Sequence, residues 1–236
     1  MGRMRNKNIK VADWGLLPYK DAWERQEEFF SQIITRKRDN RKLEHPFPTD
    51  NYLFFVSHPP VFTLGKSGKM EHLLLNEQAL EAKGISFFST NRGGDITYHG
   101  PGQIVGYPLL DLDNFFTDIH RYLRCLEEVI IKTLADFGID GARSDRETGV
   151  WLDLGTPLAR KICAMGVRAS RWVTMHGFAF NVNTDLSYFD YIVPCGIHGK
   201  GVTSMSHELK LHLEEQEVKA QILKHFRVVF EAEMIN

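Results

Sequence analysis

A run of twelve residues, 92–103, limits the folds open to this chain more than any other stretch of its sequence. The run contains four glycines and a proline, together with an arginine, an aspartate and a histidine. Glycine allows positive φ angles and close backbone approach, whereas proline fixes φ and removes a backbone donor. The run therefore predicts a shaped loop with polar side chains between two strands, residues 85–89 and 104–110. Its simplest interpretation is a tight turn in a sheet.

Neither common nucleotide-binding loop matches this run. A P-loop ends in Gly-Lys-Ser/Thr, which is missing, and the glycine spacing is not that of a dinucleotide fingerprint. Residues 65–69, Gly-Lys-Ser-Gly-Lys, come closer to a P-loop. However, Pro60 stands where that motif needs its first glycine. The sequence therefore predicts no phosphate loop.

The rest of the chain mixes helical and strand-like patterns. Apolar residues at helical spacing predict helices over residues 19–34, 77–83, 118–137 and 208–230. Further strands are predicted over residues 11–14, 52–56, 61–64, 150–154, 161–169 and 172–181, the last two joined by a turn at Ser170-Arg171. Because the two kinds of element do not alternate strictly, we expect an α+β fold, a mixed sheet with flanking helices in one domain over residues 1–236.

Composition narrows the class of protein. The 236 residues carry a net charge of -1, which argues against a dedicated nucleic-acid binder. Three cysteines are too few for a disulfide scaffold and favour a reducing compartment. No apolar run is long enough to span a bilayer, and the basic N-terminus is not followed by a signal-like apolar segment. We expect a cytoplasmic protein with no membrane partner, an organelle matrix being the alternative.

Residues 36–42 hold five basic side chains in seven positions. Charge runs usually lie in water, so a solvated loop is the first interpretation. The alternative is a docking patch for an acidic partner.

Two of the cysteines compete as a nucleophile. Cys163 lies in an apolar strand, where a free cysteine is usually buried core. Cys195 lies between Pro194 and Gly196 in a polar loop, where a thiol is more accessible and nearby N–H groups could face an oxyanion. This reasoning favours Cys195 over Cys163.

A thiol nucleophile needs a neighbouring base or cation. The candidates in this sequence are Lys161, His99, His176 and His198. Lys161 begins an apolar strand, where a lysine can extend its amine to solvent or, if partly buried, act as a general base. Cys195 and His198 have a metal-like spacing, but no second ligand pair exists, so we expect no metal.

Several motifs in order resemble one family. The run 92–103 looks like the signature of the octanoyl-[acyl-carrier-protein]:protein octanoyltransferases of lipoate biosynthesis. The similarity continues through residues 149–151, 160–168, 176–181, 194–197 and 201–204, and spans about residues 50–206. Two departures stand out: residues 36–42 look like an insertion, and Cys163 stands where small apolar residues are usual.

The resemblance implies a fold like the catalytic domain of biotin and lipoate protein ligases, and a specific chemistry. Cys195 would form an acyl-thioester, and Lys161 would lower the pKa of that thiol. The donor would be octanoyl-acyl-carrier protein, which brings its own phosphopantetheine, so no cofactor is expected. The acceptors would be lysines on lipoyl domains of 2-oxoacid dehydrogenase complexes and on the glycine cleavage H protein. The implied acyl-binding residues are Arg92, Gly93, Gly94, Asp95, Ile96, Thr97, Tyr98, His99, Ala164, Met165, Gly166, Gly177, Phe178 and Ala179.

Two other functions fit the same sequence. An ATP-dependent lipoate or biotin ligase would share the fold but activate its acid as an adenylate. A non-catalytic module that binds acyl groups or docks a carrier protein would keep the cavity without turnover.

Overall fold

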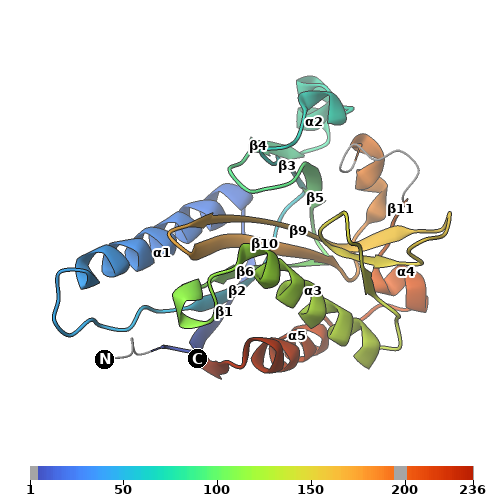
Figure 1. Cartoon of the computed structure of the whole chain (residues 1–236). Coiled ribbons are helices and arrows are strands. Elements are labelled where there is room, and N and C mark those ends of the chain that lie inside the picture. Colours follow the sequence, from blue (N-terminus) through green and yellow to red (C-terminus); the bar gives the residue numbers. More distant parts are fainter. Residues whose placement is uncertain (1–4, 194–200, 236) are drawn as a thin grey trace.

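The computed structural model describes residues 5–193 and 201–235, which form two sheets with helices on both faces of the larger one (Figure 1). The large sheet mixes parallel and antiparallel pairs, as predicted for an α+β fold. In spatial order its strands are β12 (Glu233–Ile235), β1 (Asn8–Leu16), β2 (Tyr52–Ser57), β6 (Gln103–Leu109), β10 (Val173–Asn181), β9 (Arg160–Ser170), β8 (Val150–Leu152) and β7 (Ala142–Arg143), with β11 (Gly201–Val202) paired to β9.

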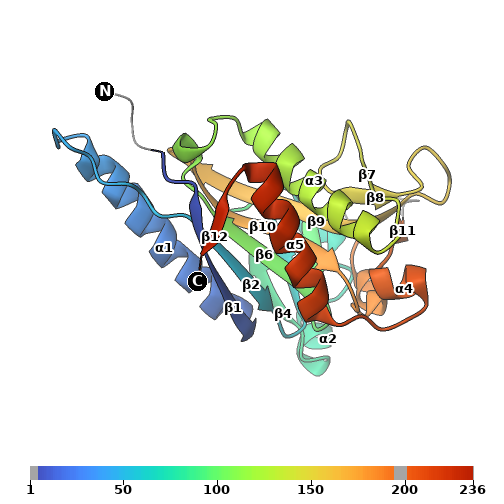
Figure 2. The same ribbon diagram turned by 90° about the horizontal axis from the view of Figure 1, so that it is seen from below.

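Three long helices sandwich this sheet. Helix α1 (Tyr19–Asn40) packs on one face, while α3 (Ile119–Asp136) and α5 (Glu215–Phe230) lie side by side on the other (Figure 2). The α3 stripe predicted from its spacing is buried, and Asp118 caps the helix by accepting a hydrogen bond from the Arg121 N–H at 2.9 Å. The short elements are α2 (Glu77–Ala82), α4 (Met205–Leu209) and the 3₁₀ turns η1 (Met70–His72), η2 (Leu112–Asn114) and η3 (Leu186–Tyr191).

A second sheet holds the glycine-rich run in place. It consists of β4 (Ser86–Ser89), β3 (Val61–Leu64) and β5 (Ile96–His99). Strand β5 lies inside the run that the sequence predicted to be a loop, because antiparallel pairing with β3 makes the middle four residues of the run a strand. Only residues 92–95 and 100–102 of the run are irregular. The run is therefore a loop, a strand and a turn.

Several predicted boundaries differ from the structure, and three of these differences have an identifiable physical cause. Residues 36–40 belong to helix α1, so the solvated-loop interpretation of the basic segment is wrong for them. The predicted helix over residues 208–230 is divided between α4 and α5. Lys210 ends α4 in a left-handed conformation, and the Asn183 side-chain amide then forms hydrogen bonds with the N–H and the carbonyl oxygen of Leu213. The turn between β9 and β10 is Arg171-Trp172, both with positive φ.

The basic segment contains one buried cation. The Lys37 amine is 7% exposed; it forms ion pairs with Asp111 and, at 3.0 Å, with Asp113, and it donates to the Arg171 carbonyl oxygen at 2.7 Å. Asp111 also accepts a hydrogen bond from the Thr49 hydroxyl at 2.7 Å. This lysine therefore ties the end of α1 to the sheet and is not part of a docking patch.

Replacing Lys37 with methionine should lower the free energy of unfolding by about 3 kcal/mol, because it leaves the buried Asp111 carboxylate without its cation. Urea unfolding followed by circular dichroism measures this change. Lys42→Met alters an exposed lysine of the same segment and should change stability by less than about 0.5 kcal/mol. Equal losses in the two variants would show that the Lys37 ion pairs do not stabilise the fold.

Candidate active site

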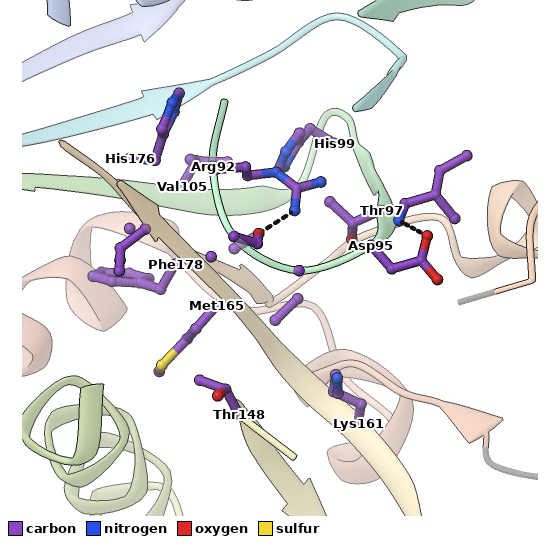
Figure 3. A pocket seen from close by; sticks show the side chains of 18 of the residues that line it. Arg92, Asp95, Thr97, His99, Val105, Thr148, Lys161, Met165, His176 and Phe178 are labelled. Carbon is purple, nitrogen blue, oxygen red and sulfur yellow. Dashed lines mark hydrogen bonds between the residues drawn. The ribbon is translucent and has the colours of Figure 1, made fainter. Parts of the chain in front are cut away.

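A single cavity of about 550 Å³ brings together the segments that the sequence singled out (Figure 3). Its walls are the loop after β4, strands β9 and β10, and the first turn of α1. The sequence-predicted residues that line it are Arg92, Gly93, Gly94, Asp95, Ile96, Thr97, His99, Lys161, Ala164, Met165, Gly166, Gly177, Phe178 and Ala179. Cys195 lies outside the described residues.

Tyr98 does not line this cavity. Side chains alternate along a strand, so Thr97 and His99 face the cavity while Tyr98 faces the opposite side of β5. There its ring stacks on Tyr188 with centroids 4.6 Å apart and packs against Phe62. Its side chain thus belongs to the core of the second sheet, and the substrate contact that the resemblance implied for Tyr98 stays a prediction.

The floor of the cavity is built from small residues. In the β9–β10 pairing Ala164 lies opposite Ala179, and Gly166 lies opposite Gly177, so all four share one face of the sheet. A Cβ atom on Gly166 would stand 2.6 Å from the Gly93 carbonyl oxygen. The loop therefore packs directly on the sheet at Gly166, and the small side chains of Ala164 and Ala179 line the cavity beside this contact.

Backbone hydrogen bonds hold the loop over this floor. The Gly93 N–H donates to the Val167 carbonyl oxygen at 2.9 Å on β9. From the other side, the Lys66 and Ser67 N–H groups donate to the carbonyl oxygens of Arg92 and Gly94, at 2.9 and 3.1 Å. Residues 65–69, the segment that resembled a phosphate loop, therefore hold the glycine-rich loop in place through backbone hydrogen bonds.

Arg92 is buried and fixes the loop to the second sheet. Its guanidinium donates to the Thr63 carbonyl oxygen at 2.6 Å, to the Thr63 hydroxyl at 2.8 Å and to the Gly93 carbonyl oxygen at 3.0 Å. The side chain thus binds neighbouring groups of the protein itself, and Arg92 also lines the cavity.

His99 belongs to a hydrogen-bonded chain that crosses the site. The Gln103 amide donates to Tyr98 O and to Asn181 Oδ1, so its oxygen is left to accept from His99 Nδ1–H at 2.8 Å. Asn181 in turn donates to the Thr203 carbonyl oxygen at 3.0 Å, just after β11. This network connects β5, β6, β10 and the segment beside Lys161.

Lys161 presents its amine at the cavity wall. Its amine nitrogen lies 4.5 Å from the centre of the Trp151 ring, a cation–π distance. Gly149, with φ +121°, lets the chain pass so close to β9 that a Cβ atom there would lie 2.6 Å from the Cys163 carbonyl oxygen, and the Lys161 side chain packs beside it. The buried Glu127 carboxylate accepts from the Gly149 N–H at 2.9 Å and fixes this bend. Strand β11 pairs with β9 here, Val202 opposite Lys161.

Comparison with known proteins decides the family. The model of the lipoyl protein ligase A/B catalytic domain matches residues 18–227. The octanoyltransferase of Flavobacterium johnsoniae is 64% identical over 231 residues, covering 98% of this chain and all of that protein. The chain belongs to the octanoyltransferase family. The octanoyltransferase of Bacteroides thetaiotaomicron is 49% identical and covers 90% of this chain and 91% of its own length.

Solved structures share the fold of this octanoyltransferase family member at low identity. The bi-partite lipoate protein ligase of Thermoplasma acidophilum superposes with a TM-score of 0.66 and 16% identity, covering 99% of this chain and 88% of that one. A lipoate-protein ligase A bound with ATP gives a TM-score of 0.64 at 16% identity, covering 98% and 90%. The expected ligase-like catalytic fold is confirmed.

The two described cysteines of this octanoyltransferase are poor nucleophiles. Burial raises the pKa of the Cys163 thiol far above its usual range, and the side chain is fully buried in the core. Burial also raises the pKa of Cys125, on the partly buried side of α3. Because the thiolate is the reactive form, the core role predicted for Cys163 fits its surroundings.

Several cavity residues escaped the sequence analysis. Tyr19 begins an ordinary amphipathic helix, Tyr107 lies within a strand, and Thr148 lies in a loop. None of them has a local pattern that indicates a site, because the tertiary fold alone brings them to the cavity.

None of the helices in the described part of the chain combines the length and apolar character that a membrane span needs.

Buried histidines predict acid sensitivity. Burial lowers the pKa of His58 to about 4 and that of His176 to about 3, from the usual 6.5. Between pH 6.5 and about 4 the unfolded chain therefore binds more protons than the folded one, so stability falls as the pH is lowered. Each histidine contributes roughly 3 kcal/mol to this loss at ~1.36 per pKa unit.

Urea midpoints measured at pH 7.5 and pH 5.0 test this expectation. The midpoint should be clearly lower at pH 5.0, and the difference should shrink in His58→Gln, which removes one of the titrating groups. Midpoints that do not change between the two pH values would contradict it.

Proposed function

We propose that this octanoyltransferase takes the octanoyl group from octanoyl-acyl-carrier protein onto Cys195 and passes it to a lysine of a lipoyl domain. In the first step the Cys195 thiolate attacks the donor thioester carbonyl, and the phosphopantetheine thiolate leaves with the proton that Lys161 took from Cys195. In the second step the acceptor amine attacks the acyl-cysteine. An amide forms, the Cys195 thiolate leaves, and Lys161 takes the amine proton.

One observation supports this proposal most strongly: Lys161, the glycine-rich loop and the small residues of the floor all line the same cavity. Burying an octanoyl chain on such a floor contributes on the order of 5 kcal/mol at ~0.8 per methylene. An amine at the wall of an apolar channel is where an acyl-transfer base is needed.

The chain on either side of residue 195 also supports the proposal. Phe189 and Gly201, before and after the segment that contains Cys195, both line the cavity. Val202 then pairs with Lys161 in the sheet. The described residues that flank this segment thus reach the cavity, which supports a nucleophile in the sequence between them.

The lipoyl-domain acceptor comes from the lipoylation proteins that share this family and fold. The archaeal ligase with the same fold is described together with its E2 lipoyl domain. We extend the proposal to lipoyl domains of 2-oxoacid dehydrogenases and to the glycine cleavage H protein, with cytoplasmic action and no added cofactor.

A transfer assay tests the proposal. The purified protein is mixed with octanoyl-acyl-carrier protein and an unmodified lipoyl domain, without ATP, and the intact mass of the lipoyl domain is followed. We expect octanoylation without ATP. Modification that requires ATP and free octanoate would identify a ligase instead. Binding of the donor with no modified acceptor would identify a non-catalytic module.

A further inference from the structure

A buried tryptophan lies beside the Lys161 amine. Trp151 is the middle residue of β8, lines the cavity and is 2% exposed. It stands opposite Lys161 in the antiparallel pairing of β8 with β9. Residues opposite one another in such a pair carry their side chains on the same face of the sheet. The two strands therefore hold the indole ring and the amine next to each other.

The contact between them is a cation–π contact in a place from which most water is excluded. Lys161 Nζ lies 4.5 Å from the centre of the Trp151 ring. Lys10 and Lys83 also lie over aromatic rings, at 5.5 and 4.8 Å, but both of these lysines are exposed. Indole is the best aromatic partner for a cation, and the attraction is strongest where the cation is desolvated. The ring therefore favours the charged ammonium of Lys161 over the neutral amine.

The surrounding strands fix the position of the ring. On the side away from β9, Trp151 pairs with Ala142 of β7. Strand β8 begins after the bend at Gly149, whose N–H donates to the Glu127 carboxylate at 2.9 Å. That carboxylate also forms an ion pair with Arg124 at 3.1 Å. Because β8 is paired on both sides, the ring is in place before any substrate binds.

Other charged residues of the cavity could act on the same amine. Arg92 and Asp95 lie apart from Lys161 (Figure 3), and Asp95 is paired with His72 at 2.6 Å. Glu147 also lines the cavity, and a carboxylate attracts an ammonium. Glu147 is therefore the competing source of stabilisation for the Lys161 ammonium.

We propose that Trp151 is a positioning residue that stabilises the ammonium form of Lys161 and, through it, the thiolate of Cys195. The inference rests on the proposed octanoyl transfer, in which the Cys195 proton moves to the Lys161 amine. That transfer creates the cation that the ring attracts, so the pair shifts from thiol and amine to thiolate and ammonium. When the acceptor amine later gives its proton to Lys161, the ring stabilises the same ammonium again.

The test follows the thiolate directly, without donor or acceptor. Iodoacetamide alkylates the thiolate form of cysteine, and intact mass gives the rate, with Cys195→Ser as the background. In Trp151→Leu the rate of Cys195 alkylation at pH 7 should fall about tenfold. Trp151→Phe keeps an aromatic face and should stay within about threefold of the wild type. Trp172→Leu alters a tryptophan that is 42% exposed at the β9–β10 turn, so it is the matched control and should alkylate normally.

A double-mutant cycle shows whether the ring acts through the amine. In a Lys161→Met background, Trp151→Leu should cause no further fall in the alkylation rate, because no ammonium is left to stabilise. If leucine prevents folding, 5-fluorotryptophan keeps the shape of the ring and weakens its negative face. Fluorination of the tryptophans should then lower the rate about twofold in the wild type and leave it unchanged in Trp151→Phe.

Three outcomes would overturn the proposal. One is an unchanged alkylation rate in folded Trp151→Leu or in the fluorinated wild type. Another is an equal fall caused by Trp151→Leu with and without Lys161, which would assign the tryptophan a structural role only. The third is a fall in Glu147→Gln with none in Trp151→Leu, which would assign the stabilisation to the carboxylate. Failure of the proposed function is distinct, since the wild type would then octanoylate no lipoyl domain, whatever its alkylation rate.

Discussion

Replacing Lys161 with methionine should lower the rate of octanoyl transfer by a factor of about 10² to 10⁴ while the protein stays folded. The amine at the cavity wall is the base that our proposal assigns to both proton transfers. Methionine keeps a flexible apolar stem against Trp151 and Gly149, so the loss is chemical more than structural. Single-turnover transfer to a lipoyl domain measures the rate, and circular dichroism checks the fold.

Lys161→Arg separates the two roles that a lysine can have beside a thiol. Arginine keeps the positive charge but stays protonated, so it cannot act as a base. We expect nearly the same loss as in Lys161→Met. Near-normal transfer by Lys161→Arg would show that the site needs only a cation there. Lys132→Met, which alters an exposed lysine on α3, is the matched control and should transfer normally.

The sequence predicted the parts of this fold that local patterns control. Helix α3 has its cap, its buried stripe and its glycine stop within one segment, and the structure reproduces it within one residue at each end. Helix α2 is likewise capped by Asn76, whose side chain accepts from the Ala79 N–H. Local chemistry alone determines such elements.

The errors arose where a distant segment decides the conformation. The charge run of α1 is helical and partly buried because Asp111, far along the chain, supplies a partner for Lys37. The break after α4 depends on Asn183, which binds Leu213 from another part of the fold. Neither partner is adjacent in sequence, so the charge run predicted a solvated segment and the periodicity predicted a continuous helix.

The candidate site likewise contains residues that the sequence predicted and residues whose positions depend on the tertiary fold. The resemblance supplied the cavity segments, and the β9–β10 register explains why Ala164, Gly166, Gly177 and Ala179 form one floor. Tyr98 differs, because a strand hidden in the glycine-rich run points it away from the cavity. The turn of His176 toward α1 depends on its backbone angle, which no sequence pattern revealed.

The second large effect concerns the nucleophile. Cys195→Ser should lower octanoyl transfer by a factor of at least about 10³, because a serine hydroxyl beside a lysine is a far weaker nucleophile than a thiolate. Cys163→Ser should transfer nearly as well as the wild type, since the Cys163 thiol is fully buried and its raised pKa keeps it protonated. Some loss of stability is expected there from placing a hydroxyl in the core.

The most direct test of the covalent route is the intact mass of the protein after incubation with octanoyl-acyl-carrier protein alone, without an acceptor. Our account predicts a single octanoyl adduct on the wild type and on Cys163→Ser, none on Cys195→Ser, and loss of the adduct when an unmodified lipoyl domain is added. An adduct that persists in Cys195→Ser and disappears in Cys163→Ser would contradict it.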